Sequence, residues 1–346
     1  MPVWRAICGG DPRLDQPIRP HQCAQPGRRH PRLVHPHRPQ SRGGMNWPWS
    51  VTAKGFAMGV ADLVPGVSGG TVAFISGIYD PLLDSLSSLS GKGLTALRKG
   101  KLLEAWNAVN GPFLVALALG IVTAIATLAS PLHWLLQHHP VMLRAFFVGL
   151  VATSVPLVGK HVKPWGLDTW VWAAIGCAVA GFVTSLPPLV QTDHPALLMT
   201  AGAVAICAML LPGISGSFLL LILGAYAPVL LAVKTLDLTK IGAFGAGAVL
   251  GLLLFSRALK WLLSAHRRPT LALLTGFLVG SLQALWPWKA QVRPLYTHSD
   301  GRVEWLLENV APHGNLAAAL GLACLGGVVV WGLHRWGNTR GMNDAG

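Results

Sequence analysis

The chain has 346 residues, of which 52% are hydrophobic and 12% are charged, and its formal net charge is +14. An average soluble domain has roughly 25% charged residues, so this composition excludes an ordinary soluble fold and predicts an all-α polytopic membrane protein. Membrane proteins carry extra lysine and arginine on their cytoplasmic loops, so the positive charge does not indicate nucleic-acid binding. The five cysteines are scattered singly, without metal-ligand spacing, and the sequence predicts no metal site and no cofactor.

Residues 1–44 differ in composition from the rest of the chain. They contain eight prolines, eight arginines and four histidines, with no apolar stretch that could form a core or a secretory signal. Two interpretations are open: a disordered basic arm that contacts anionic lipid, or residues that precede the native start at Met45. The second is favoured, because the amphipathic aromatic stretch 46–49 follows Met45 and leads directly into the first membrane element.

The first membrane element contains a helix-breaking motif within an apolar run, Pro65-Gly66-Val67-Ser68-Gly69-Gly70. Pro65 removes a backbone donor and Gly66 adds flexibility, so we expect the helix to break there. The arms, at about 51–64 and 68–80, would each be roughly 20 Å long, too short to cross a hydrocarbon core of about 30 Å. The sequence therefore predicts a re-entrant helical hairpin, with its irregular backbone satisfied by protein or by a water-filled cavity.

Three apolar spans follow the first motif, at about 111–136, 141–159 and 169–190. The motif then returns 147 residues after its first occurrence, as Pro212-Gly213-Ile214-Ser215-Gly216-Ser217. Further identities at the same offset pair Gly77, Tyr79 and Pro81 with Gly224, Tyr226 and Pro228. So many identities at one offset predict an internal repeat rather than a shared membrane composition.

A second set of spans follows the second motif, at about 240–263, 270–288 and 312–336. In these spans Gly276 and Ser281 match Gly149 and Ser154 of the first set. The chain is therefore predicted to divide into a first membrane repeat at 45–190, a second at 191–336, and a cytoplasmic tail at 337–346.

The orientation of the repeats follows from counting crossings. A re-entrant hairpin plus three spans gives an odd number, so the second repeat begins on the opposite side and is inverted. With the N-terminus in the cytoplasm, thirteen lysines and arginines of the membrane part lie on the cytoplasmic side and six lie outside, as the positive-inside rule requires. We therefore expect both termini in the cytoplasm.

The two motif tips carry groups suited to an anion, because N–H groups and hydroxyls at the start of a helix lie at its positive end. Inverted repeats whose broken elements meet near the midplane are typical of alternating-access transporters. The alternative is that the glycines only allow tight helix packing. The predicted substrate-binding residues are Ser68, Gly69, Gly70 and Thr71 in the first copy and Ser215, Gly216 and Ser217 in the second, with Pro65, Gly66, Pro212 and Gly213 as the helix breaks.

Three charged residues lie within the apolar region, where ionisable groups are costly. Asp62 either carries a coupling proton or cation, or caps a helix and pairs with Lys54. Arg144 and Arg257 either hold a phosphate group or extend to the membrane interface. We expect transport to be coupled to a proton or sodium gradient.

Three blocks of this sequence carry a resemblance to a known family: 54–79, 211–226, and 280–282 with 286–288. They resemble the bacterial undecaprenyl phosphate (polyprenyl-phosphate) translocases, over roughly 45–336. The resemblance implies a multi-pass inner-membrane transporter that returns undecaprenyl phosphate from the outer to the cytoplasmic leaflet, recycling the lipid carrier for peptidoglycan and other cell-envelope polymers. The motif tips, with Arg144 or Arg257, are compatible with the phosphate, and an apolar groove with the polyprenyl chain.

Two other functions stay open at this point. A phosphatase acting on the same lipid would need a nucleophile and a base near a tip, whereas the histidines lie in loops or at span ends, which favours a protein that is not an enzyme. A small-anion transporter or channel would favour a continuous polar lining.

Overall fold

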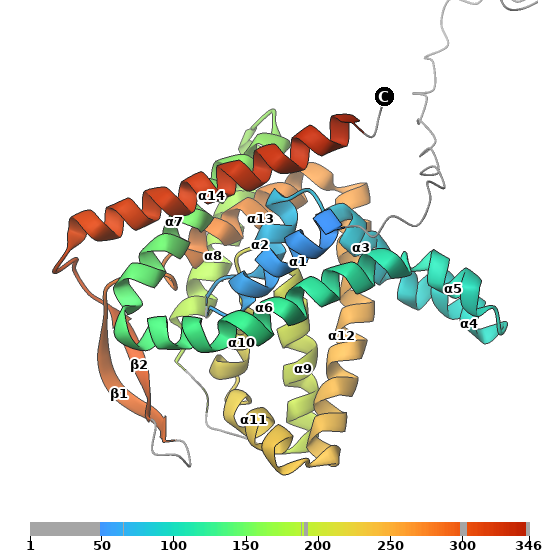
Figure 1. Cartoon of the computed structure of the whole chain (residues 1–346), viewed down its shortest axis with the longest axis horizontal. Helices are drawn as coiled ribbons and strands as arrows, with labels where there is room; N and C mark the ends of the chain where they lie inside the picture. Colours follow the sequence, from blue (N-terminus) through green and yellow to red (C-terminus); the bar gives the residue numbers. More distant parts are fainter. Residues whose placement is uncertain (1–48, 65, 188, 190–192, 298–302, 344–346) are drawn as a thin grey trace, which may run out of the picture. The chain divides into compact units, whose positions relative to one another are not determined.

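The computed structural model describes residues 49–64, 66–187, 189, 193–297 and 303–343, so the tail 1–44 and the predicted break at Pro65 lie outside the described residues (Figure 1). Within these ranges the chain is mostly helical, and five helices are long and apolar enough to cross a membrane. They are α6 (Gly111–His138), α7 (Pro140–Gly159) with the short turn Lys160–Val162, α8 (Leu167–Ser185), α12 (Leu238–Ala265) and the part of α14 up to Arg335. The prediction of a polytopic helical membrane protein is confirmed.

The part of the chain predicted as the fifth span, 270–288, is not one long helix. Helix α13 (Arg267–Ser281) has 15 residues and gives way to turns before Pro287, which cannot continue a helix. An antiparallel hairpin then follows, formed by β1 (Lys289–Thr297) and β2 (Val303–Asn309). The all-α prediction missed this hairpin. Helix α14 (Leu316–Asn343) runs on through most of the predicted tail.

Each motif element has three helices rather than the two arms of a simple hairpin. The first contains α1 (Trp49–Asp62), α2 (Gly69–Ile75) and α3 (Tyr79–Ser88), and the second contains α9 (Pro195–Leu210), α10 (Gly216–Ile222) and α11 (Tyr226–Thr235). The predicted arm 68–80 is interrupted at Gly77, whose φ is 74°, and Gly224 has a φ of 65° at the equivalent turn. Only glycine adopts this backbone without strain. The chain bends by 102° between α10 and α11.

Short helices connect the first motif element to α6. A π-helical segment (Leu89–Gly93), α4 (Leu94–Arg98) and α5 (Leu102–Ala108) follow α3, and α4 and α5 extend outward past the end of α6 in Figure 1. Asn110 then takes a left-handed backbone, with a φ of 52°, where α6 begins.

Two helix pairs within the repeats pack through equivalent glycines. Helix α1 lies on α6, where a Cβ at Gly55 would meet the main chain of Leu117 and a Cβ at Gly120 would meet that of Thr52. Helix α9 lies on α12 in the same way. There Gly202 meets the main chain of Phe244, and Gly247 meets that of Met199. Gly202 follows Gly55 by 147 residues and Gly247 follows Gly120 by 127, and the facing residues Met199 and Phe244 follow Thr52 and Leu117 at the same two offsets.

Two further pairs pack across the repeats. Gly149 of α7 faces the main chain of Ala323 in α14, and Gly276 of α13 faces that of Ala173 in α8. Each repeat thus lends its last helix to the other, and both contacts depend on an equivalent glycine. Close backbone approach at small residues is a common basis of helix association in lipid.

We predict that Gly149→Ala and Gly276→Ala will each lower the free energy of unfolding in detergent by about 1–3 kcal/mol, because the added methyl collides with the main chain of the facing helix. The matched control is Gly321→Ala in α14, where the Cβ would meet nothing within 4 Å. It should leave stability unchanged or raise it by up to about 1 kcal/mol. Equal thermal unfolding midpoints for the three variants would contradict this packing.

Candidate functional site

The two motif elements touch one another directly. The hydroxyl of Ser68 donates to the carbonyl oxygen of Leu211 at 3.1 Å, and that of Tyr79 donates to the carbonyl oxygen of Leu210 at 2.9 Å. In the opposite sense, the N–H of Gly213 donates to the hydroxyl of Thr71 at 3.1 Å. Three side chains of the first element therefore hold the main chain of the second over residues 210–213.

The first motif also organises its own helix start. Ser68 is the N-cap of α2, and its hydroxyl accepts from the N–H of Gly70 at 3.1 Å. The Asp62 carboxylate accepts from the N–H of Gly69 at 2.7 Å, which ties the end of α1 to the start of α2. This bond fulfils the capping role that the sequence offered for Asp62. Gly66 turns the chain between them, with a φ of 93°.

The second motif has the same turn but a different cap. Gly213 has a φ of 92°, and Ser215 is the N-cap of α10 without a side-chain bond to the helix. The hydroxyls of Ser215 and Ser217 lie 2.9 Å apart and bond to each other. The position equivalent to Asp62 is Met209, whose side chain lies against Gly216.

The two elements also differ in exposure. Ser68 and Thr71 are 1% and 0% exposed, and Tyr79 is 3% exposed. Ser217 is partly buried, and Tyr226, the equivalent of Tyr79, is 36% exposed. Ser215, the equivalent of Ser68, is 5% exposed, so both motif serines are buried and the difference in exposure is largest at the tyrosines.

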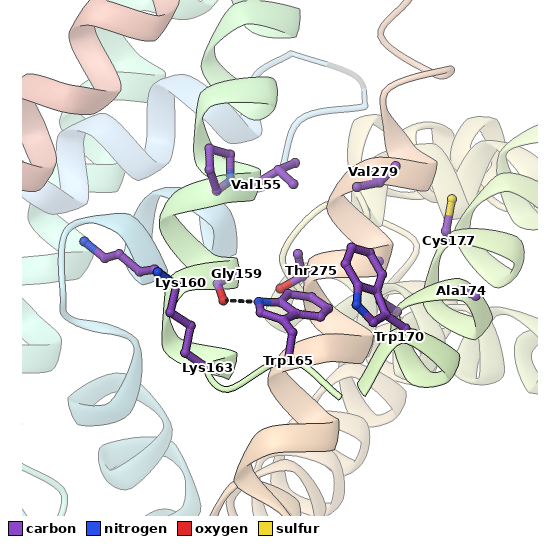
Figure 2. Close-up of a pocket in the computed structure, with 13 residues that line it drawn as sticks. Val155, Gly159, Lys160, Lys163, Trp165, Trp170, Ala174, Cys177, Thr275 and Val279 are labelled. Carbon is purple, nitrogen blue, oxygen red and sulfur yellow. Dashed lines mark hydrogen bonds between the residues drawn. The ribbon is translucent and has the colours of Figure 1, made fainter. Parts of the chain in front are cut away.

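A cavity of about 630 Å³ lies between α7, α8 and α13 (Figure 2). Trp165 stands at its centre and donates its indole N–H to the carbonyl oxygen of Gly159 at 3.1 Å, with the ring of Trp170 at 4.6 Å. The charged residues at the cavity are Lys160 and Lys163. Lys160 extends away from the indoles and contacts His334. The remaining lining is mostly apolar: Val155, Pro156, Gly159, Ala173, Ala174, Cys177, Thr275, Gly276 and Val279.

Helix α13 connects this cavity with the paired motifs. Thr275, Gly276 and Val279 line the cavity, whereas Phe277 and Leu278 are the residues that a Cβ on Gly213 would meet. A shift of α13 would therefore move residues both in the cavity lining and at the contact with Gly213.

Known proteins resemble the chain over most of its length. A family model described as undecaprenyl phosphate translocase-like matches residues 58–303, which include both motifs and the cavity. The chain belongs to this family. A polyprenyl-phosphate transporter of Vibrio cholerae is 44% identical over 76% of this chain and 85% of its own length. One of Staphylococcus aureus is 32% identical over 69% of this chain and 86% of its own length. No solved structure matches the chain.

In this translocase-like protein, Ser68 and Thr71 of the first predicted tip bond the second motif element, Ser215 and Ser217 of the second tip bond each other, and the two arginines lie elsewhere. Ser68, Thr71 and Gly213 meet at the contact between the motifs. Arg144 lies half-buried near the start of α7, whose main partners are α14 and α13, and Arg257 is exposed on α12, whose main partner is α9.

Sequence reasoning missed three features of the site. Tyr79 was identified by its repeat position, but its bond to Leu210 depends on tertiary contact. No sequence motif marks the cavity around Trp165 and Trp170. Lys289, whose charge interacts with that of Arg144, was counted only among the six basic residues expected outside. A tryptophan pair at the start of a span was the one sequence signal that could have indicated the cavity.

Ser68→Ala should destabilise the protein by about 1–2 kcal/mol, because it removes both the cap on Gly70 and the bond to Leu211. Ser215→Ala is the matched control, since this serine occupies the same motif position without bonding the helix backbone. Its effect on the thermal unfolding midpoint in detergent should be clearly smaller. If the two substitutions were equally costly, the asymmetry between the motifs would have no energetic basis.

Proposed function

We propose that this protein transports polyprenyl phosphate, with undecaprenyl phosphate as the substrate, across the bacterial cytoplasmic membrane. The proposed direction is from the outer to the inner leaflet, so that the carrier is reused for cell-envelope synthesis. Its relatives are named as transporters rather than enzymes. The observation that carries the mechanism is the direct contact between two copies of one helix-breaking motif, 147 residues apart, inside a membrane-spanning protein.

Alternating access is the mechanism that suits this contact best. The equivalent glycine contacts within and across the repeats support an inverted pair of units, each with an N-terminal motif element and three further helices. In such a pair, each residue of one repeat can take the environment that its equivalent has in the other repeat. This exchange converts a conformation open to one side of the membrane into one open to the other side. Tyr79, which is enclosed, and Tyr226, which is 36% exposed, are the residues whose environments would exchange.

The cavity between α7, α8 and α13 suits the polyprenyl chain. Its lining is mostly apolar and includes two adjacent tryptophans, and isoprene units gain free energy by leaving water for such a surface. We assign the phosphate to the motif tips. The N–H groups of Gly69 and Gly70 are bonded within the first motif, and that of Gly213 is bonded to Thr71 across the contact, so substrate entry requires these bonds to open.

We assign coupling to Asp62. Its carboxylate accepts the N–H of Gly69 at the start of α2, so a proton or sodium ion on this group would compete with that bond. Ion binding would thereby change the position of the first motif tip. A gradient of either ion could then drive the motifs apart in a fixed order.

In liposomes, the full chain should move undecaprenyl phosphate between leaflets under an imposed proton or sodium gradient. The double variant Ser68→Ala/Ser215→Ala and the single variant Arg144→Ala should each be slower by about tenfold or more, because hydrogen bonds to a charged group contribute about 1.5–3 kcal/mol. Ser264→Ala, at an exposed serine near the end of α12, is the matched control and should transport normally. A wild type that moves inorganic phosphate but no lipid would establish the small-anion alternative instead.

The cavity can be tested by filling it. Ala174→Phe places a ring among the lining residues and should slow lipid transport by about tenfold, by excluding the chain. Ala178→Phe lies one turn later on α8, is also exposed and does not line the cavity, so it should transport as wild type does. Equal rates for the two variants would remove the cavity from the pathway.

A further inference from the structure

Lys289 is held in a fixed position at the start of the β-hairpin. Its ammonium group donates to the side-chain oxygen of Asn309 at 2.9 Å, and the amide nitrogen of Asn309 donates to the carbonyl oxygen of Gln283 at 3.0 Å. The side chain is half-buried. One of the three donors of the ammonium is thus used to orient it, which leaves two for another partner.

Arg144 lies close to this lysine. The residue after Arg144, Ala145, packs against Trp288, the residue before Lys289, in a small cluster that also contains Ala319. Burial and the nearby positive charge of Arg144 lower the pKa of Lys289 to about 8. Arg144 and Lys289 are both half-buried and their like charges repel one another, so an anion between them would remove the repulsion.

Carboxylates in the described part of the chain form their ion pairs elsewhere, and none pairs with Arg144 or Lys289. Glu308 pairs in register with Ala290, so its side chain lies on the opposite face of the hairpin from Lys289 and Asn309. Glu304 pairs with Tyr296, roughly 20 Å farther along the strands. Three histidines also lie near this end: His138 and His139, which precede the first turn of α7, and His313, which is exposed in the loop after β2.

The surroundings fit a lipid head group. The rings of Trp286 and Trp288 lie 5.6 Å apart, and their N–H groups donate to the carbonyl oxygens of Val310 and His313. Tryptophan is enriched where a membrane meets water. The cavity lined by Gly159 lies roughly 22 Å away, at the other end of α7.

The same segment leads to the first motif. Leu285, four residues before Lys289, is the side chain that a Cβ on Gly66 would meet at 3.0 Å. A phosphate held at Lys289 would therefore lie on the part of the chain that packs against the first motif turn.

We propose that Arg144 and Lys289 together bind the phosphate monoester of polyprenyl phosphate, at the end of α7 opposite the cavity, before it reaches the motifs. This inference rests on the proposed function. Arginine offers a planar fork to two phosphate oxygens and lysine adds a compact charge, so the pair favours a doubly charged monoester over the singly charged diester of a phospholipid.

The test is equilibrium binding of radiolabelled undecaprenyl phosphate to the full chain in phosphatidylcholine nanodiscs, between pH 7 and pH 9.5. Arginine stays charged and a phosphate monoester is close to fully ionised over this range, so a change in affinity reports Lys289. Lysine is charged below its pKa and neutral above it. Wild-type affinity should therefore fall by about tenfold as the pH rises through 8.

The variants separate charge from structure. Lys289→Arg should keep high affinity at pH 9.5, whereas Lys289→Ala should bind about tenfold more weakly at pH 7 and show no pH dependence. Lys234→Ala, at an exposed lysine on α11, should keep the wild-type profile. An unchanged thermal unfolding midpoint for Lys289→Arg shows that the site is tested in a folded protein.

The site is overturned if Lys289→Ala binds the lipid as wild type does, or if Lys289→Arg loses affinity with pH as wild type does; lipid movement in liposomes would then still support the proposed function. Phosphatidylglycerol and inorganic phosphate serve as competitors. Failure of both to displace the lipid at equal concentration supports a lipid monoester site. Lys289-dependent binding of inorganic phosphate without binding of the lipid overturns both the site and the lipid assignment.

Discussion

The main chain of a broken helix must find hydrogen-bond partners when lipid surrounds it, since an unpaired N–H or carbonyl in hydrocarbon costs several kcal/mol. This protein has two such breaks, one between α1 and α2 and one between α9 and α10, and it pairs them with each other. Ser68, Thr71 and Tyr79 supply bonds that the residues around the second break need. Each motif element therefore depends on the other, although they are far apart in the sequence.

The surrounding helices keep these breaks together by close packing at glycines. Because α8 packs on α13 and α14 packs on α7, the last helix of each repeat packs against a helix of the other repeat. Neither set of spans can separate without exposing main-chain contacts such as those at Gly149 and Gly276. The helices that pack across the repeats are thus held by extensive main-chain contacts, whereas the motifs are held together by a few hydrogen bonds. The contact between the motifs is therefore much easier to break and re-form.

The sequence predicted what depends on length and composition. The spans at 111–136 and 240–263 agree with α6 and α12 within a few residues, because long apolar runs have one stable form in lipid. The sequence-based prediction was wrong where the local structure depends on contacts between distant parts of the chain. The arm 68–80 is interrupted because Gly77 turns the chain, and the strands from Lys289 and Val303 form only by pairing with each other. For the candidate site, the repeat drew attention to the motif serines and Thr71 followed the first motif directly, whereas Lys289 and the cavity around Trp165 depend on neighbours distant in sequence.

The hydrogen bonds between the motifs have different kinds of partner on the two elements. On the first element they are side chains, and on the second they are main-chain atoms of Leu210, Leu211 and Gly213. A main-chain atom is present whatever residue occupies the position. Substitutions at positions 210 and 211 can therefore accumulate without loss of the bonds, while the first copy must retain its serine, threonine and tyrosine. After a duplication, such an arrangement lets the second copy change its side chains and constrains those of the first, so the two halves are no longer equivalent. Met209 at the position of Asp62 and Phe218 at the position of Thr71 illustrate this difference.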